Sequence, residues 1–249
     1  MLSLWIYTIA SVVVVSLISL IGVFTLAMGR KRLQRILFIL VSLAVGAMLG
    51  DAFIHLLPES FGRSRNSLEA SFYCLAGLIS FFVLEKFLLW RHDHAAEHSH
   101  PIHPVGYINL IAEGLHNFID GFLIGASYLV SIPIGLATTI AVLLHEIPQE
   151  IGHFGILLHA GFSSSKAIGL NFLTALLSIL GAILSLLMGA HLHHFSEGVL
   201  PLAAGGFIYI AGSDLVPELH KEREPPQAAV QLLAIGVGIG LMLLLKLLE

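Results

Sequence analysis

Long apolar stretches with almost no charge dominate this sequence and limit what it can fold into. A bilayer has a hydrocarbon core about 30 Å thick, and a helix needs roughly 20 apolar residues to cross it. The chain has 249 residues, of which 57% are hydrophobic and 11% are charged. Its apolar stretches fall at about 2–28, 36–57, 70–90, 105–129, 134–158, 167–189, 199–218 and 228–248. We expect an all-α polytopic membrane protein with eight transmembrane helices and one membrane domain over residues 1–249.

The basic residues indicate how these helices are oriented. Most Lys and Arg residues fall in the connections after the first, third, fifth and seventh stretches. Because Lys and Arg accumulate in cytoplasmic loops, both termini are predicted to be extracytoplasmic. The connection 91–104 is then a cytoplasmic His-rich loop that contains His92, His94, His98, His100 and His103. Such a loop is typical of loose metal binding, with a solvated linker as the alternative.

Charge and cysteine content exclude two classes of protein. The 12 Lys and Arg residues are outnumbered by 16 Asp and Glu residues, so no basic excess indicates a nucleic-acid partner. Cys74 is the only cysteine, which excludes an intrachain disulfide framework and a thiolate zinc cluster. The lipid bilayer is therefore the expected environment of the whole chain.

Carboxylates in the fourth and fifth apolar stretches need a compensating charge. The fourth stretch contains Glu113 and Asp120, and the fifth contains Glu146 and Glu150. An ionisable group at the centre of a bilayer costs about 2.5–3.5 kcal/mol, and no Lys or Arg occurs in residues 92–165. Protons, distant basic side chains or a bound cation could compensate these charges. Only a cation uses every polar residue of the cluster.

Helical spacing places these polar residues on one face of each helix. The sets are Glu113, His116, Asn117 and Asp120 in the fourth stretch, and His145, Glu146, Gln149, Glu150 and His153 in the fifth. His116 and His145 each follow a proline by twelve residues, which is about 18 Å of helix and close to the membrane midplane. Consecutive helices run antiparallel, so an inverted repeat is predicted at mid-bilayer, where transporters bind substrates.

A second internal similarity lies outside this pair. The segment His55–Glu59, HLLPE, is similar to Asp214–Glu218, DLVPE. The first three and last three stretches are therefore predicted to be related. This gives a 3+2+3 arrangement with an inverted pseudo-twofold repeat around the central pair.

Imidazole, carboxylate and amide groups together suit Zn²⁺ better than Ca²⁺ or Mg²⁺, which prefer oxygen alone. Thiolates would hold zinc too tightly for release, and none is available near the cluster. The ligand types therefore indicate passage of a divalent metal rather than permanent binding.

Four segments together resemble a known family. They are HNFIDGFLIGAS from His116, HEIPQEIG from His145, GDAFIHLLPE from Gly50 and AGGFIYIAGSDLVPELH from Ala204. They are similar to the ZIP (Zrt/Irt-like protein) family of divalent metal transporters. The resemblance implies eight helices with both termini outside, a two-metal site between the fourth and fifth helices, alternating access and a homodimer.

The resemblance also implies roles for individual residues. One metal position corresponds to His116, Asp120, His145 and Gln149, and its neighbour to Asn117, Asp120 and Glu146. Secondary metal or pathway residues are expected at Glu113, Glu150, His153, Asp51, His55, Asn171, Asp214 and Glu218. This chain departs from the family pattern at Gln149, where many relatives have His, and at His153, where many have Asp. For His153 and Asn171 the alternative is helix–helix hydrogen bonding.

We expect transport of Zn²⁺ into the cytoplasm, with Fe²⁺, Mn²⁺ and Cd²⁺ as lesser substrates and no resident cofactor. The short loops favour a prokaryotic plasma membrane. An intramembrane zinc hydrolase is the rival class, because His145 and Glu146 begin a HExxH-like string, but Gln149 stands where the second His is needed. A non-transporting metal sensor is the third alternative.

Overall fold

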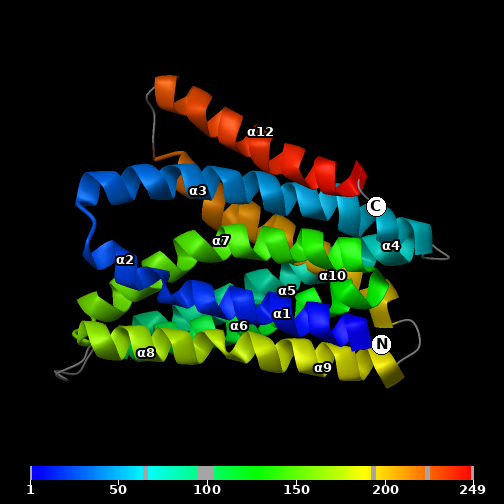
Figure 1. Ribbon diagram of the computed structural model, residues 1–249, viewed down its shortest axis with the longest axis horizontal. Coiled ribbons are helices and arrows are strands. Elements are labelled where there is room, and N and C mark those ends of the chain that lie inside the picture. The colour runs from blue at the N-terminus through cyan, green and yellow to red at the C-terminus, as the bar shows by residue number, and fades with distance from the viewer. Residues whose placement is uncertain (1, 64–66, 95–103, 192–194, 222–224, 248–249) are drawn as a thin grey trace.

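A computed structural model describes residues 2–63, 67–94, 104–191, 195–221 and 225–247. These residues form long helices that lie side by side along the longest axis of the molecule (Figure 1), and they contain no strand. The prediction of an all-α protein is therefore confirmed for the described part of the chain.

Each predicted apolar stretch overlaps one helical run. In chain order the elements are α1 (Leu2–Ile18), the 3₁₀ turn η1 (Ser19–Ile21), α2 (Gly22–Leu26), α3 (Arg30–Gly50), the π-helical turn η2 (Asp51–Leu56), α4 (Leu57–Arg63), α5 (Ser67–His94), α6 (Pro104–Val130), α7 (Ile132–His159), α8 (Ser164–Ala175), α9 (Leu177–His191), α10 (Phe195–Tyr209), the π-helical turn η3 (Ile210–Leu215), α11 (Val216–Leu219) and α12 (Pro225–Leu247). α5 continues to His94, four residues beyond its predicted end. The boundary differs because polar residues at the end of a membrane helix do not stop the helix, so loss of hydropathy does not mark its end.

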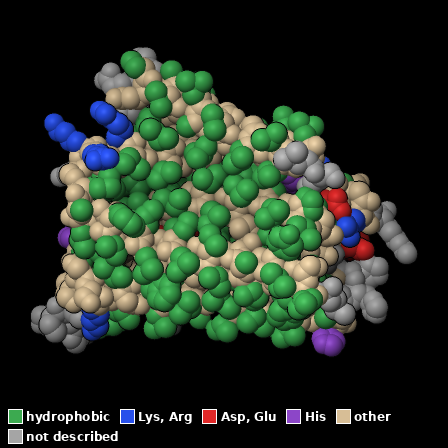
Figure 2. Space-filling view, viewed as in Figure 1, with side chains coloured by type: hydrophobic (Ala, Val, Ile, Leu, Met, Phe, Trp, Pro, Cys, Tyr) green, Lys and Arg blue, Asp and Glu red, His purple; other side chains and the backbone are tan. Residues whose placement is uncertain are grey.

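Seven helices of the described residues are long and apolar enough to cross a membrane, and they cover Leu2–Leu26, Lys31–Arg63, Ser67–Lys86, Ile132–His159, Ser164–His191, Glu197–Leu219 and Pro226–Leu247. α6 is not among them, because the polar residues around His116 lower its hydropathy. Figure 2 shows apolar side chains over most of the visible face, with most of the visible Lys and Arg side chains at its left edge and a basic side chain beside Asp and Glu side chains at its right edge. The chain is a multi-pass membrane protein by these criteria.

Glycines allow three pairs of helices to touch along their backbones. Between α6 and α9, a Cβ on Gly121 would lie 1.8 Å from the carbonyl oxygen of Ser178, and one on Gly181 would lie 2.0 Å from that of Phe118. Reciprocal contacts of the same kind join α3 to α12 through Gly46 and Gly238, and α5 to α10 through Gly77 and Gly205. Small residues at such crossings are typical of membrane helices, whose association depends on close van der Waals packing.

The two similar segments of the sequence have the same backbone feature. η2 and η3 each have six residues, and each is followed by one residue and then a proline, Pro58 or Pro217. Proline lacks the N–H that would close the preceding α-helical turn, and a wider π turn accommodates this loss. The similarity between the two segments therefore extends from the sequence to the local structure.

Helices α6 and α7 are joined by Ser131 alone. The hydroxyl of Ser131 accepts a hydrogen bond from the N–H of Ile134 at 3.3 Å, and Pro133 occupies the first turn of α7. Both are typical signals for a helix start. This tight connection places the two polar helix faces against each other.

Candidate metal site

Four side chains from α6 and α7 bring their ligand atoms together. Nε2 of His145 lies 3.1 Å from Oδ2 of Asp120 and 3.5 Å from Oε1 of Glu146. Nε2 of His116 lies 3.3 Å from the same Glu146 oxygen and 3.7 Å from the same Asp120 oxygen. One donor atom from each of the four residues lies within 4.8 Å of the other three. This mixed nitrogen and oxygen set could hold a divalent metal.

The ring of His145 is oriented by the backbone of its own helix. Its Nδ1 lies 3.0 Å from the carbonyl oxygen of Ala141, and its side chain is fully buried. A carbonyl oxygen only accepts, so Nδ1 donates in this contact and Nε2 is the ring nitrogen that faces Asp120. A bound metal would take the lone pair of Nε2 in the neutral ring.

A second group consists of carboxylates only. Oxygens of Glu113, Glu146 and Glu150 lie within 4.8 Å of one another, and all three side chains are buried. Glu146 therefore belongs to both groups. His153 places its Nε2 2.7 Å from Oε2 of Glu113.

The amides of the predicted site contact these carboxylates. Nδ2 of Asn117 donates to Oε1 of Glu113 at 2.8 Å, and Nδ2 of Asn171 donates to Oε2 of Glu150. Both amides are fully buried. Gln149 is partly exposed and lines a cavity of about 200 Å³ together with His116 and other residues.

Asp51 and His55 lie apart from the four-ligand cluster. They are fully buried, with Nδ1 of His55 3.3 Å from Oδ1 of Asp51. Oδ2 of Asp51 accepts a hydrogen bond of 2.9 Å from Thr138. Thr138 precedes His145 by seven residues, which is about 10 Å along α7.

Asp214 and Glu218 are exposed and lie on the opposite side of the cluster. Asp214 lines the 200 Å³ cavity together with Glu113 and His116. Glu218 forms an exposed ion pair with Lys221. Of the loop histidines, His92 and His94 end α5, whereas His98, His100 and His103 lie outside the described residues.

Comparison with known proteins identifies the family. A family model described as ZIP Zinc transporter matches residues 2–105 and 90–246. The chain belongs to the ZIP family of zinc transporters. This family consists of transporters and not of enzymes, so the prediction that the chain is not an enzyme is confirmed and the hydrolase alternative is wrong.

Three relatives illustrate the similarity. Zinc transporter ZIP13 of Pongo abelii is 39% identical over 222 residues, covering 84% of this chain and 66% of the relative. Zinc transporter ZIP13 of Danio rerio is 32% identical over 274 residues, covering 88% and 77%. Zinc transporter SLC39A7 of Mus musculus is 30% identical over 338 residues, covering 99% and 71%.

Two residues without a predicted role also face the cavity of this ZIP family member. The hydroxyl of Tyr209 on α10 donates a hydrogen bond to Glu85 on α5, and both side chains line the cavity beside His116. In the sequence, Glu85 and Lys86 stand near the end of the third apolar stretch, as local or interfacial charges do. In the structure Lys86 instead lies over the ring of Phe82, 5.9 Å from its centroid. Only the tertiary structure brings Glu85 next to α6 and α7.

Proposed function

We propose that this ZIP family protein transports Zn²⁺ into the cytoplasm through the site between α6 and α7. The observation that carries the proposal is the four-ligand cluster of His116, Asp120, His145 and Glu146, whose donor atoms lie within 4.8 Å of one another. Two imidazoles and two carboxylates match the ligands that zinc accepts in proteins. Among the described residues these donor atoms contact one another, and a cation between them would satisfy all four at once.

Two metals occupy the site in this proposal. The resemblance to the family assigns His116, Asp120, His145 and Gln149 to one position, and Asn117, Asp120 and Glu146 to its neighbour. The burial of Asn117 next to the cluster and the exposure of Gln149 to the adjoining cavity are compatible with these roles. Glu113, Glu150, His153 and Asn171 serve as secondary ligands or orient them.

The proposed membrane architecture has eight crossings, which are the seven apolar helices and α6. The polar face of α6 lowers its mean hydropathy below that of the other crossings. α6 has 27 residues, enough to span about 40 Å. Both ends of the described chain lie at the same end of the bundle (Figure 1), as an even number of crossings requires. The equivalent π turns η2 and η3 support a 3+2+3 arrangement with an inverted repeat.

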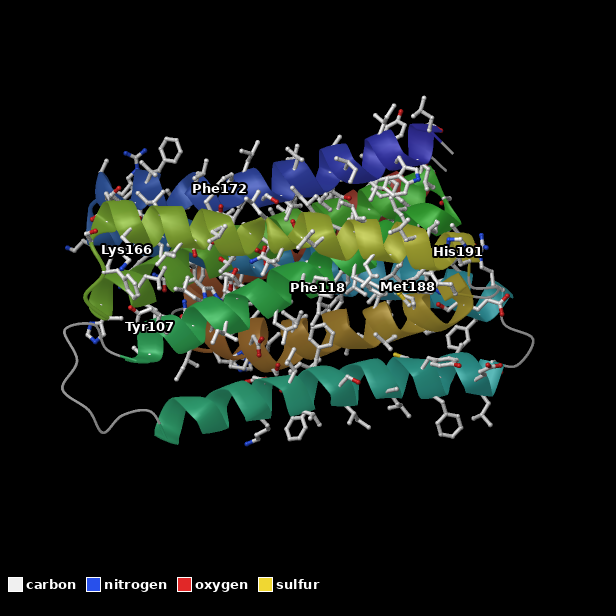
Figure 3. All side chains as sticks on the ribbon, turned by 90° about the horizontal axis from the view of Figure 1, so that it is seen from below. Tyr107, Phe118, Lys166, Phe172, Met188 and His191 are labelled. Carbon is white, nitrogen blue, oxygen red and sulfur yellow. The ribbon has the colours of Figure 1, made fainter. Side chains whose placement is uncertain are left out.

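Positions along the bundle support the proposed orientation. Figure 3 places Tyr107 and Lys166 near one end, His191 near the other, and Phe118, which follows Asn117, about midway. Lys166 belongs to the set of basic residues that the positive-inside rule assigns to the cytoplasm. The cluster then lies near the midplane, and both termini face away from the cytoplasm.

Alternating access is proposed because the cavities that adjoin the cluster among the described residues extend toward Asp214 and Glu218. The 200 Å³ cavity at His116 shares Gln149, His153 and Asp214 with a second cavity of about 580 Å³. The second shares Glu218 with a third of about 770 Å³, which Arg35 and Lys221 also line. On the other side, Asp51, His55 and Thr138 are fully buried. The described conformation is therefore open to the proposed cytoplasmic side, and transport requires a second conformation that opens the other side.

The remaining parts of the proposal concern selectivity and assembly. Fe²⁺, Mn²⁺ and Cd²⁺ are proposed as lesser substrates, and a homodimer as the assembly that the family resemblance implies. The relatives named above come from animals, so they do not support the prokaryotic plasma membrane expected from the short loops. The proposal is a multi-pass protein whose basic loops and residues 91–104 face the cytoplasm.

Uptake of ⁶⁵Zn²⁺ into proteoliposomes tests the proposal. The purified full chain is compared with His116→Ala and Glu146→Ala, and with His159→Ala as a matched control, because His159 is exposed on the same helix as His145. Saturable uptake that both site variants lose and the control keeps is the expected result. Zinc binding without uptake by the unmodified chain would refute transport and favour a sensor. Competition by Fe²⁺, Mn²⁺ and Cd²⁺ then gives the order of selectivity.

A further inference from the structure

The carboxylates of Glu113, Glu146 and Glu150 form a cluster, and neighbouring side chains compensate its negative charge only in part. Each contributes an oxygen within 4.8 Å of the other two, and each side chain is about 1% exposed. Imidazoles contact two of them: His153 lies 2.7 Å from Glu113, and Glu146 has His116 at 3.3 Å and His145 at 3.5 Å. Buried carboxylates at this separation repel one another strongly unless cations or protons compensate them.

Two buried amides donate hydrogen bonds to Glu113 and Glu150. Asn117 donates its Nδ2 to Glu113, and Asn171 donates its Nδ2 to Glu150. Oδ1 of Asn171 and Oε1 of Glu150 have no hydrogen-bond partner among the described residues, although both are buried. Oδ1 of Asn117 also has none there, but Asn117 belongs to the neighbouring metal position. A buried acceptor without a partner is destabilising, so these orphaned oxygens indicate a missing electropositive partner.

We propose that Glu113, Glu146 and Glu150 form a divalent cation position with oxygen ligands only, on the cavity side of the His116 and His145 cluster. It differs from the neighbouring position that the family resemblance assigns to Asn117, Asp120 and Glu146. Its chemistry favours harder cations such as Mn²⁺, whereas the imidazoles favour Zn²⁺.

The place of this position along the helices follows from their antiparallel course. Glu113 precedes His116 by three residues on α6, and Glu150 follows Glu146 by four residues on α7, so both are displaced toward the same end of the bundle. Glu113 lines the cavity that continues to Asp214. This role in metal release rests on the proposed transport function. In that function, a metal passes from the cluster of His116, Asp120, His145 and Glu146 to the three glutamates, and then enters the cavity.

Mn²⁺ binding to the purified full chain tests the position, because the electron paramagnetic resonance signal of free Mn²⁺ measures the bound fraction. The double variant Glu113→Gln with Glu150→Gln is expected to weaken Mn²⁺ binding by at least about tenfold. Substitution of a residue that only orients a metal ligand already weakens binding by about tenfold or more, and these two residues are proposed as direct ligands. The double variant His116→Ala with His145→Ala is expected to retain Mn²⁺ binding and to lose most zinc binding. Glu69→Gln is the control, because Glu69 is exposed on α5.

Retained Mn²⁺ affinity in the glutamine variant, or its loss in the histidine variant, would overturn the proposal. A measurement on the unmodified chain avoids dependence on the folding of variants. Electron spin echo modulation of bound Mn²⁺ should show no directly coordinated ¹⁴N, and strong imidazole modulation would equally overturn the proposal. Failure of ⁶⁵Zn²⁺ uptake would refute transport and leave the Mn²⁺ result unchanged, so the two failures are distinguishable.

Discussion

Nε2 of His145 lies 3.1 Å from Oδ2 of Asp120, and this contact joins α7 to α6 in the buried interior of the bundle. The other ring nitrogen of His145 is held by the carbonyl oxygen of Ala141. Asp120 is therefore the anionic partner of a ring whose orientation is already set. This relationship makes Asp120 the most informative residue for testing the metal site.

Asp120→Asn preserves the shape of the side chain and removes its charge. Outer-shell substitutions alone cost about 10–100-fold in metal affinity, so loss of a direct anionic ligand is expected to weaken zinc binding by at least about 100-fold. Isothermal titration of the purified protein measures this change. Glu69→Gln serves as the control, because Glu69 is exposed on α5 and its substitution also removes one negative charge. Unchanged affinity would show that Asp120 is not a ligand.

Gln149→His adds an imidazole beside the cluster, and His is the residue that the family resemblance leads us to expect at this position. Because imidazole is a stronger zinc ligand than an amide oxygen, zinc should bind more tightly and leave more slowly. The expected kinetic result is a lower KM for ⁶⁵Zn²⁺ uptake without an increase in maximal rate. An unchanged KM would contradict the assignment of Gln149 to a metal position.

Zinc should stabilise the folded chain through the same cluster. A ligand at 100 times its Kd raises the free energy of unfolding by about 2.7 kcal/mol when it binds the folded state alone. Thermal unfolding in detergent, with zinc or with a chelator, should show this difference in Tm. The difference should disappear in His116→Ala with His145→Ala, and its persistence there would place the stabilising metal elsewhere.

Asp214 and His55 occupy equivalent places in the two similar segments but differ in exposure, since Asp214 is exposed and His55 is fully buried. In a Cys74→Ser background, Asp214→Cys should react with a membrane-impermeant thiol reagent applied from the cytoplasmic side. His55→Cys should stay unreactive from either side in the described conformation. Rapid labelling of His55→Cys would contradict the closure of that side.

Gly181→Ala should destabilise the contact between α6 and α9. The new Cβ would meet the backbone oxygen of Phe118 at 2.0 Å, and overpacking of this kind costs about 1–3 kcal/mol. A lower Tm in detergent is the expected result. Gly240→Ala on α12 is the control, because a Cβ there meets no atom within 4 Å. Equal Tm values for the two variants would mean that α6 and α9 can move apart to accommodate the new Cβ without loss of stability.

Much of the candidate site could be predicted because its residues follow helical spacing. His116 and Asp120 are four residues apart, and His145 and Glu146 repeat the pattern on the next helix, so each polar face was visible in the sequence. The similarity of HLLPE and DLVPE likewise corresponds to the paired π turns η2 and η3. Hydropathy does not give the ends of helices, since α5 continues to His94 although its apolar stretch ends at residue 90.

Residues on distant helices could not be assigned in this way. Glu85 and Tyr209 are 124 residues apart, and no spacing rule connects them. The amide of Asn171 likewise reaches Glu150 only because α8 packs against α7.

The sequence by itself determined that this chain is helical and apolar and that two of its helices each have a polar face of His, Asp, Glu and amide residues, because these properties depend on composition and local periodicity. Only the tertiary structure decided which donor atoms meet and on which side the cavities lie. It also grouped Glu113 with Glu146 and Glu150. Distances between side chains on different helices depend on how the helices cross, and close glycine contacts such as those of Gly121 and Gly181 set that crossing.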